Sequence, residues 1–106
     1  MSEFRHLSVL KDGDLSVVRF NPQSLHSSLG MEVGAELSAV AAENECQKLV
    51  LTLSDIDFLF SDTLGRIVAA NNIMKQKGGK LSLCEVRPPI REVLAVTKLD
   101  TIFDVT

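Results

Sequence analysis

The sequence predicts one α/β domain covering residues 1–106, with a small mixed, largely parallel sheet of four to five strands and about three helices. Short apolar runs of strand length alternate with longer segments in which apolar residues recur every three or four positions. Near the start, Asp12-Gly13 separates two alternating runs, which is typical of a hairpin. The predicted order of elements is therefore β-β-α-β-α-β-α-β.

The first three elements are a hairpin and a helix. Strands are expected at residues 7–10 and 15–20, and Pro22 follows the second because proline has no amide hydrogen to donate to a sheet. A helix is expected at residues 25–44, where the apolar side chains fall on one face. That face comprises Leu29, Val33, Leu37, Val40 and Ala41.

The second half of the chain repeats the alternation of strand and helix. The near-continuous apolar run at residues 48–53 suits a central strand covered on both faces. A helix is expected at residues 62–77 and a strand at 81–84, after which Pro88-Pro89 opens a helix that ends near residue 96. A last strand is expected at residues 101–105. The long helix has an apolar face of Leu64, Ile67, Val68, Asn71 and Met74.

The composition argues against several classes of function. The formal net charge is −3 and no Lys/Arg cluster is present, whereas nucleic-acid binding needs a basic footprint. The chain also has no Trp or Tyr on which bases would stack. No apolar run approaches the roughly 20 residues that cross a bilayer, and the first residues lack a signal-peptide core. We therefore expect a cytoplasmic protein without nucleic acid or membrane insertion.

The residues that most often form metal and catalytic sites are sparse. Cys46 and Cys84 match no zinc or CxxC spacing, which predicts reduced structural thiols. His6 and His26 are isolated, so no metal site is expected. Neither a GxxxxGK[ST] nor a GxGxxG loop occurs, and no catalytic triad is apparent. The sequence thus predicts a protein that is not an enzyme and has no cofactor.

Ser61 is the main candidate functional residue, because it lies in the stretch DFLFSDTLGR, where a predicted strand ends and a predicted helix begins. As a helix N-cap, its hydroxyl would accept hydrogen bonds from the amides of the next turn. Asp62 would suit the positive end of the helix dipole. The alternative is a phosphorylation switch, since a helix N-terminus also accommodates a phosphate.

The chain from Lys48 onward resembles the STAS domain, which is shared by bacterial anti-sigma factor antagonists and the cytoplasmic tails of sulfate transporters. Three motifs carry the resemblance: FSDTLG at residues 60–65 after a hydrophobic strand, GGKL at 78–81, and RPPIREV at 87–93 before LDTIF at 99–103. The resemblance implies a small sheet of four or five strands with helices packed on it. This fold agrees with the order of elements derived above.

The resemblance also implies a function. Free-standing STAS proteins bind an anti-sigma factor that is also a serine kinase, and phosphorylation of a serine at the helix start releases them. A phosphatase of the PP2C type reverses the modification. Aligned on Leu64-Gly65, that serine is Ser61, with Thr63 as an alternative acceptor. A phosphate of charge about −1.5 to −2 would disrupt a complementary partner surface.

Two departures from the family pattern leave alternatives open. Phe60 stands where members often carry an acidic residue or serine, and Asp62-Thr63 replaces small residues. These departures favour a scaffold that is not phosphorylated, or an accessory subunit of another assembly such as a lipid-transport complex. Weak nucleotide binding is a third reading, because helix N-termini can hold phosphates.

A partner is expected to contact the residues around Ser61 and a stripe of the long helix beside its core face. That stripe would equally suit packing under a neighbouring helix. The edge of the N-terminal hairpin could pair with a second copy, so we expect a monomer or a weak homodimer. The predicted partner-binding residues are Asp57, Phe60, Asp62, Thr63, Arg66, Ala69, Ala70 and Ile73.

Overall fold

The computed structural model describes residues 6–21, 30–54, 56 and 61–105 as a five-stranded sheet with helices. Most predicted elements are confirmed with ends shifted by one or two residues, although residues 25–29, where the first helix was expected to begin, lie outside the described residues. The elements in chain order are β1 (Leu7–Asp12), β2 (Leu15–Phe20), α1 (Gly30–Ala42), β3 (Lys48–Thr52), α2 (Ser61–Gln76), β4 (Lys80–Cys84), α3 (Pro88–Val96), the 3₁₀-helix η2 (Leu99–Thr101) and β5 (Asp104–Val105).

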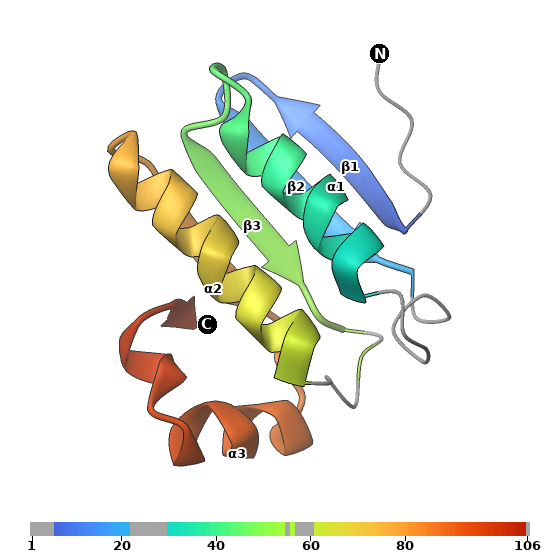
Figure 1. Cartoon of the computed structure of the whole chain (residues 1–106), viewed down its shortest axis with the longest axis vertical. Coiled ribbons are helices and arrows are strands. Elements are labelled where there is room, and N and C mark those ends of the chain that lie inside the picture. The colour runs from blue at the N-terminus through green and yellow to red at the C-terminus, as the bar shows by residue number, and fades with distance from the viewer. Residues whose placement is uncertain (1–5, 22–29, 55, 57–60, 106) are drawn as a thin grey trace.

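The strands lie in the order β1-β2-β3-β4-β5. The pair β1–β2 is antiparallel, and every later neighbour pairs in parallel, which confirms the mixed, largely parallel sheet. Gly13 has a φ of 61° in the hairpin turn, where a residue without Cβ is favoured. Helices α1 and α2 lie side by side over one face of the sheet (Figure 1).

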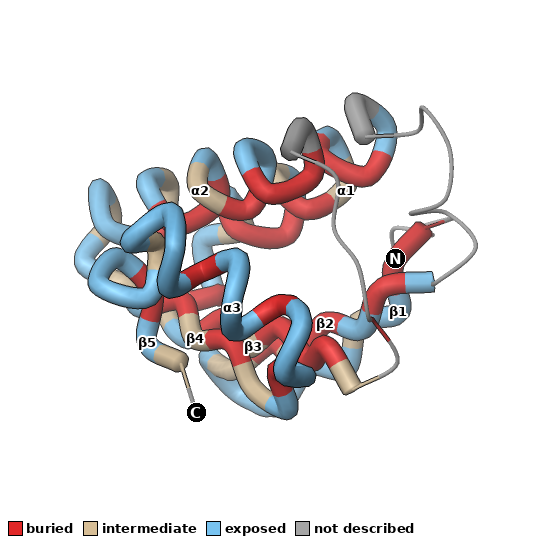
Figure 2. Tube along the Cα trace, turned by 90° about the horizontal axis from the view of Figure 1, so that it is seen from below, coloured by how far each residue is buried: buried red, intermediate tan, exposed pale blue. Residues whose placement is uncertain are grey.

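The core lies between this helical layer and the sheet, as the buried residues in Figure 2 show. The expected face of α1 is fully buried as far as it is described, from Val33 to Ala41, and Leu29 lies outside the described residues. On β3, Leu49 and Leu51 are buried whereas Val50 is only half-buried. β3 is the central strand of the sheet, as predicted, but the face that carries Val50 is partly open.

The end of the chain departs from the prediction. Residues 99–101 form η2, and only Asp104–Val105 pairs with β4, so the strand expected at 101–105 is too long. Lys98 has a left-handed φ of 62°, and Ile102 keeps a helical backbone. These turns return the chain to the sheet, and Phe103, directly before β5, is buried in the core.

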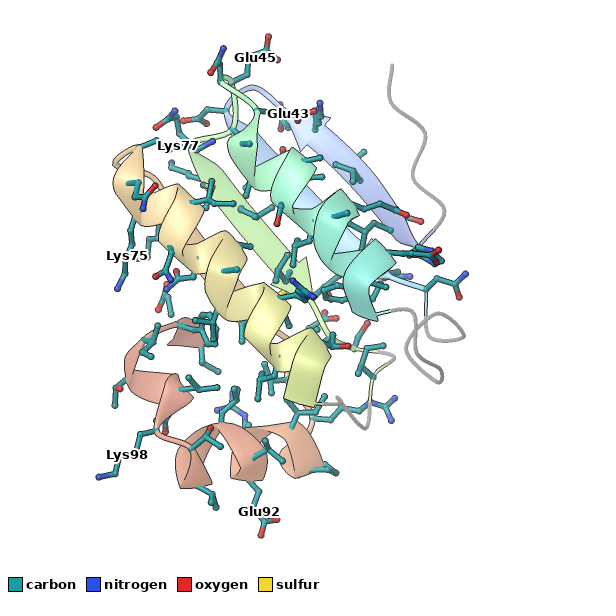
Figure 3. The ribbon with its side chains drawn as sticks, viewed as in Figure 1. Glu43, Glu45, Lys75, Lys77, Glu92 and Lys98 are labelled. Carbon is teal, nitrogen blue, oxygen red and sulfur yellow. The ribbon has the colours of Figure 1, made fainter. Side chains whose placement is uncertain are left out.

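Glu43 ties the two long helices to the edge of the sheet. Its carboxylate lies 2.7 Å from the Nζ atom of Lys11 on β1, and this hydrogen bond raises the pKa of the lysine. Lys77, just after α2, donates from Nζ to the Glu43 carbonyl oxygen at 2.7 Å. Figure 3 shows Lys77 directed toward Glu43, whereas Lys75 points away from the helix. The carboxyl ends of α1 and α2 are thus held together.

Candidate functional site

The candidate site lies where α2 begins, after the carboxyl end of β3. Ser61 and Asp62 are the first two residues of α2, one position further into the helix than the sequence predicts, a shift within the usual spread of helix boundaries. The first-turn amides of a helix have no partner within that helix. Together with the dipole they favour a negative charge at this end. Asp57 and Phe60 of the predicted site lie outside the described residues.

Thr63 occupies a different environment from the one expected of a kinase acceptor. Only 3% of its surface is exposed, and it takes part in a polar interaction. A buried hydroxyl is closed to an incoming kinase in this conformation. Leu64, the next residue, is buried in the core. Thr63 would therefore have to become exposed before a kinase or a partner could reach its hydroxyl.

The predicted stripe on α2 divides into exposed and buried residues. Arg66 and Ala69 are exposed, and they remain available to a partner. Ala70 is fully buried in the core, and Ile73 is half-buried and packs against that core. Their burial fits the alternative reading, in which part of the stripe packs inside the protein.

Helix α1 comes very close to α2 at Gly34. A Cβ atom placed on this buried glycine would lie 2.5 Å from Cδ of Arg66, so the glycine lets the arginine stem cross over α1. The arginine side chain therefore lies at the junction of the two helices.

Gly65 is an exposed position that the sequence reasoning did not assign to the partner surface. A Cβ atom added to Gly65 would meet nothing within 4 Å. Residues four apart lie on the same face of a helix, so Gly65 follows Ser61 and precedes Ala69 along one line of α2. The spacing of these three residues was the available signal. We call Gly65, Arg66 and Ala69 the outer stripe of α2.

His6, isolated in the sequence, has carboxylate neighbours in the fold. Its Nε2 atom lies 3.2 Å from Oε2 of Glu32, and its backbone amide donates to Oε1 of Glu36 at 3.0 Å. These contacts join the start of β1 to α1. Within the described ranges, no three His, Cys, Asp or Glu side chains gather closely enough to hold a metal ion. Cys46 and Cys84 are free thiols.

The order of elements and the strand pairing define a small mixed α/β domain. The model of the STAS domain matches residues 8–106, and this chain belongs to that family. Among curated relatives, the anti-sigma F factor antagonist of Paenibacillus polymyxa is 29% identical over 83 residues, which cover 78% of this chain and 70% of the relative. None of the described helices has both the length and the apolar character that crossing a bilayer requires.

Solved structures share the fold. An anti-sigma-factor antagonist (STAS) domain protein from Planctomyces limnophilus superposes with a TM-score of 0.82 at 21% identity, over 94% of this chain and 87% of that one. The Bacillus cell fate determinant SpoIIAA in its phosphorylated form has a TM-score of 0.69 at 13% identity, over 94% of this chain and 90% of its own. At these identities the likeness establishes the fold alone.

Proposed function

We propose that this protein is an anti-sigma factor antagonist of the bacterial cytoplasm, switched by phosphorylation of Ser61. The unphosphorylated protein binds an anti-sigma factor that is also a serine kinase, and the sigma factor is thereby released. The Ser61 hydroxyl then attacks the γ-phosphorus of ATP held by that kinase, giving phosphoserine, ADP and a proton. A PP2C-type phosphatase hydrolyses the phosphoserine with water to serine and inorganic phosphate.

The observation that carries the proposal is the position of Ser61 as the first residue of α2. A phosphate there meets the first-turn amides, which point away from the helix body, and the positive end of the helix dipole, so the domain itself tolerates the modification. Thr63 and Leu64, the third and fourth residues of α2, are buried in the core. The added charge therefore acts on the partner rather than on the fold.

The relatives support the same reading. The name of the Paenibacillus polymyxa relative describes an antagonist of an anti-sigma factor. SpoIIAA shares this fold and is known in a phosphorylated form. The outer stripe of α2, directly beyond Ser61, offers small exposed side chains and one guanidinium at which a partner can approach the helix. We assign the partner contact to this stripe together with Ser61 and Asp62.

The proposal is tested by the intact mass of the protein purified from the source organism, with and without phosphatase treatment. We expect a phosphate that maps to Ser61 in at least one growth state. In Ser61→Ala the added mass of the phosphate should be absent, and the partner should stay bound. The free energy of unfolding should fall by no more than about 1 kcal/mol. Ser38→Ala on α1 is the matched control, and it should leave both mass and binding unchanged. Wild-type protein without phosphate in every growth state would refute the switch.

A constitutive scaffold is the second candidate, favoured by Phe60 and Asp62, the two departures next to Ser61. A carboxylate beside the hydroxyl already places negative charge at the helix start. In that case, the same Ser61→Ala variant would bind its partner no differently from the wild type in every growth state. The mass experiment and the binding experiment together separate the two functions.

A further inference from the structure

The connection between β4 and α3 lies against the first residues that follow β3. The amide of Leu53 donates to the carbonyl oxygen of Cys84 at 3.1 Å, which extends the pairing of the two strands by one residue. Because α2 follows β3 and α3 follows β4, both helices begin at the same edge of the parallel sheet (Figure 1). Side chains of the β4–α3 connection therefore reach the segment that leads to Ser61.

Two side-chain hydrogen bonds cross between these connections. Arg87 donates from Nε to the backbone carbonyl oxygen of Ser54 at 2.6 Å, and this bond is charge-assisted. The hydroxyl of Thr52, a buried residue, donates to Oε2 of Glu85 at 3.1 Å. Both bonds join residues 33 apart in the sequence.

The backbone around Glu85 and Arg87 is constrained. Glu85 has a φ of 54°, a left-handed conformation that costs a residue with Cβ free energy and that local contacts must maintain. Arg87 is extended, at φ −75° and ψ 155°, as the proline that follows it requires. The guanidinium thus extends from a short and stiff connection rather than from a long loop.

The segment that these contacts hold is close to Ser61 along the chain. The amide of Ile56 donates to the carbonyl oxygen of Leu53 at 3.0 Å, and the Ile56 side chain is buried in the core. Four residues separate Ile56 from Ser61, a path of at most ~18 Å. The position at which this path starts therefore limits where the serine and its flanking residues can lie.

We propose that Arg87 is a positioning residue for the switch: by holding Ser54, it fixes the start of the β3–α2 connection and so presents Ser61 to the kinase. The bond from Thr52 to Glu85 ties the same connection to β3 two residues before the arginine. This role rests on the proposed function of Ser61. Arg87 is itself exposed, so we attribute to its bond with Ser54 the ordering of this connection rather than the packing of α3.

The test compares Arg87→Met with Arg91→Met. Methionine keeps the aliphatic stem and removes the guanidinium, and Arg91 is an exposed arginine one turn further along α3. Backbone hydrogen exchange is measured on the isolated protein, and the fraction of Ser61 that carries phosphate is measured in cells of the source organism. We expect Arg87→Met to accelerate exchange about tenfold at the hydrogen-bonded amides of Leu53 and Ile56 and to lower the phosphate fraction several-fold. Arg91→Met should change neither.

The outcomes separate the two proposals. Unchanged exchange in Arg87→Met would overturn the positioning role. Faster exchange with an unchanged phosphate fraction would also overturn it, because Arg87 would then have a structural role alone. Wild-type protein without phosphate would refute the switch itself, and the exchange data would still decide whether Arg87 orders this connection. Thr52→Val, which removes only the hydroxyl bonded to Glu85, should accelerate exchange at the same amides by a smaller factor.

Discussion

Replacing Asn71 with leucine should stabilise the protein. Asn71 lies on the core face of α2, is only 3% exposed, and its Nδ2 atom has no hydrogen-bond partner among the described residues. Its neighbours one helical turn away on the same face, Ile67 and Met74, are fully buried. Leucine has the same branched shape without the amide, so the substitution removes an unsatisfied donor while it keeps the core filled.

The magnitude follows from three contributions. An unsatisfied buried polar group costs about 1–3 kcal/mol, and leucine is a better helix former than asparagine by roughly 0.4 kcal/mol. The larger volume of leucine opposes these gains by about 1 kcal/mol if the neighbours must shift. We expect a net gain of about 1–2 kcal/mol in the free energy of unfolding, or a Tm higher by roughly 5–10 °C.

Urea denaturation followed by circular dichroism measures the effect for Asn71→Leu, with Asn72→Leu as the matched control. Asn72 is the next residue and is exposed, so the same substitution there should change stability by less than about 0.5 kcal/mol. An unchanged slope against urea would show that the difference reflects stability. A loss of more than about 1 kcal/mol for Asn71→Leu would refute the reasoning, because the amide would then be satisfied, for instance by a buried water.

Three further predictions concern close approaches and charge. Gly79→Ala should destabilise the protein by about 1–3 kcal/mol in thermal unfolding, because its Cβ would lie 2.7 Å from a backbone oxygen. Gly34→Ala should stay within about 1 kcal/mol of the wild type, because the flexible Arg66 side chain can move away and alanine favours the helix. Hydrogen bonds from Lys80 and then Ser82 lower the pKa of Asp104, so their contribution is present above the ordinary value of 3.8 and is lost as the pH falls through the lowered pKa. In an NMR titration the Asp104 midpoint should rise toward 3.8 in the Lys80→Met variant, and an unmoved midpoint would contradict this cause.

The arrangement of elements was predictable because each has a strong local signal. The run at residues 48–53 has the length and apolar content of an inner strand, and it is the central strand of the sheet. The spacing of Val33 and Leu37 fixes the buried side of α1 without reference to any other part of the chain. The last strand was overestimated because nothing in residues 99–103 distinguishes a 3₁₀ turn from an extended run.

The candidate site was less predictable, because alanine carries little information about which side of a helix is buried. Ala69 and Ala70 are neighbours with the same side chain, yet one is exposed and the other is fully buried. A turn of about 100° per residue separates their directions, and only the packing of α2 against the rest of the fold decides between them. The bond from Arg87 to Ser54 depends on two strand ends meeting, which no local pattern encodes.

The division between exposed and buried residues at the start of α2 explains how a charge could be added there without loss of the fold. Leu64 and Ile67 hold the helix to the core from the side that faces the sheet. The first turn offers amides on the side of Ser61, and Gly65 and Ala69 leave the surface beyond it without bulky side chains. A partner that approaches this surface closely must desolvate whatever lies at the helix start. Since a buried, unpaired charge costs several kcal/mol, a phosphate on Ser61 would dissociate such a partner while the domain remained folded.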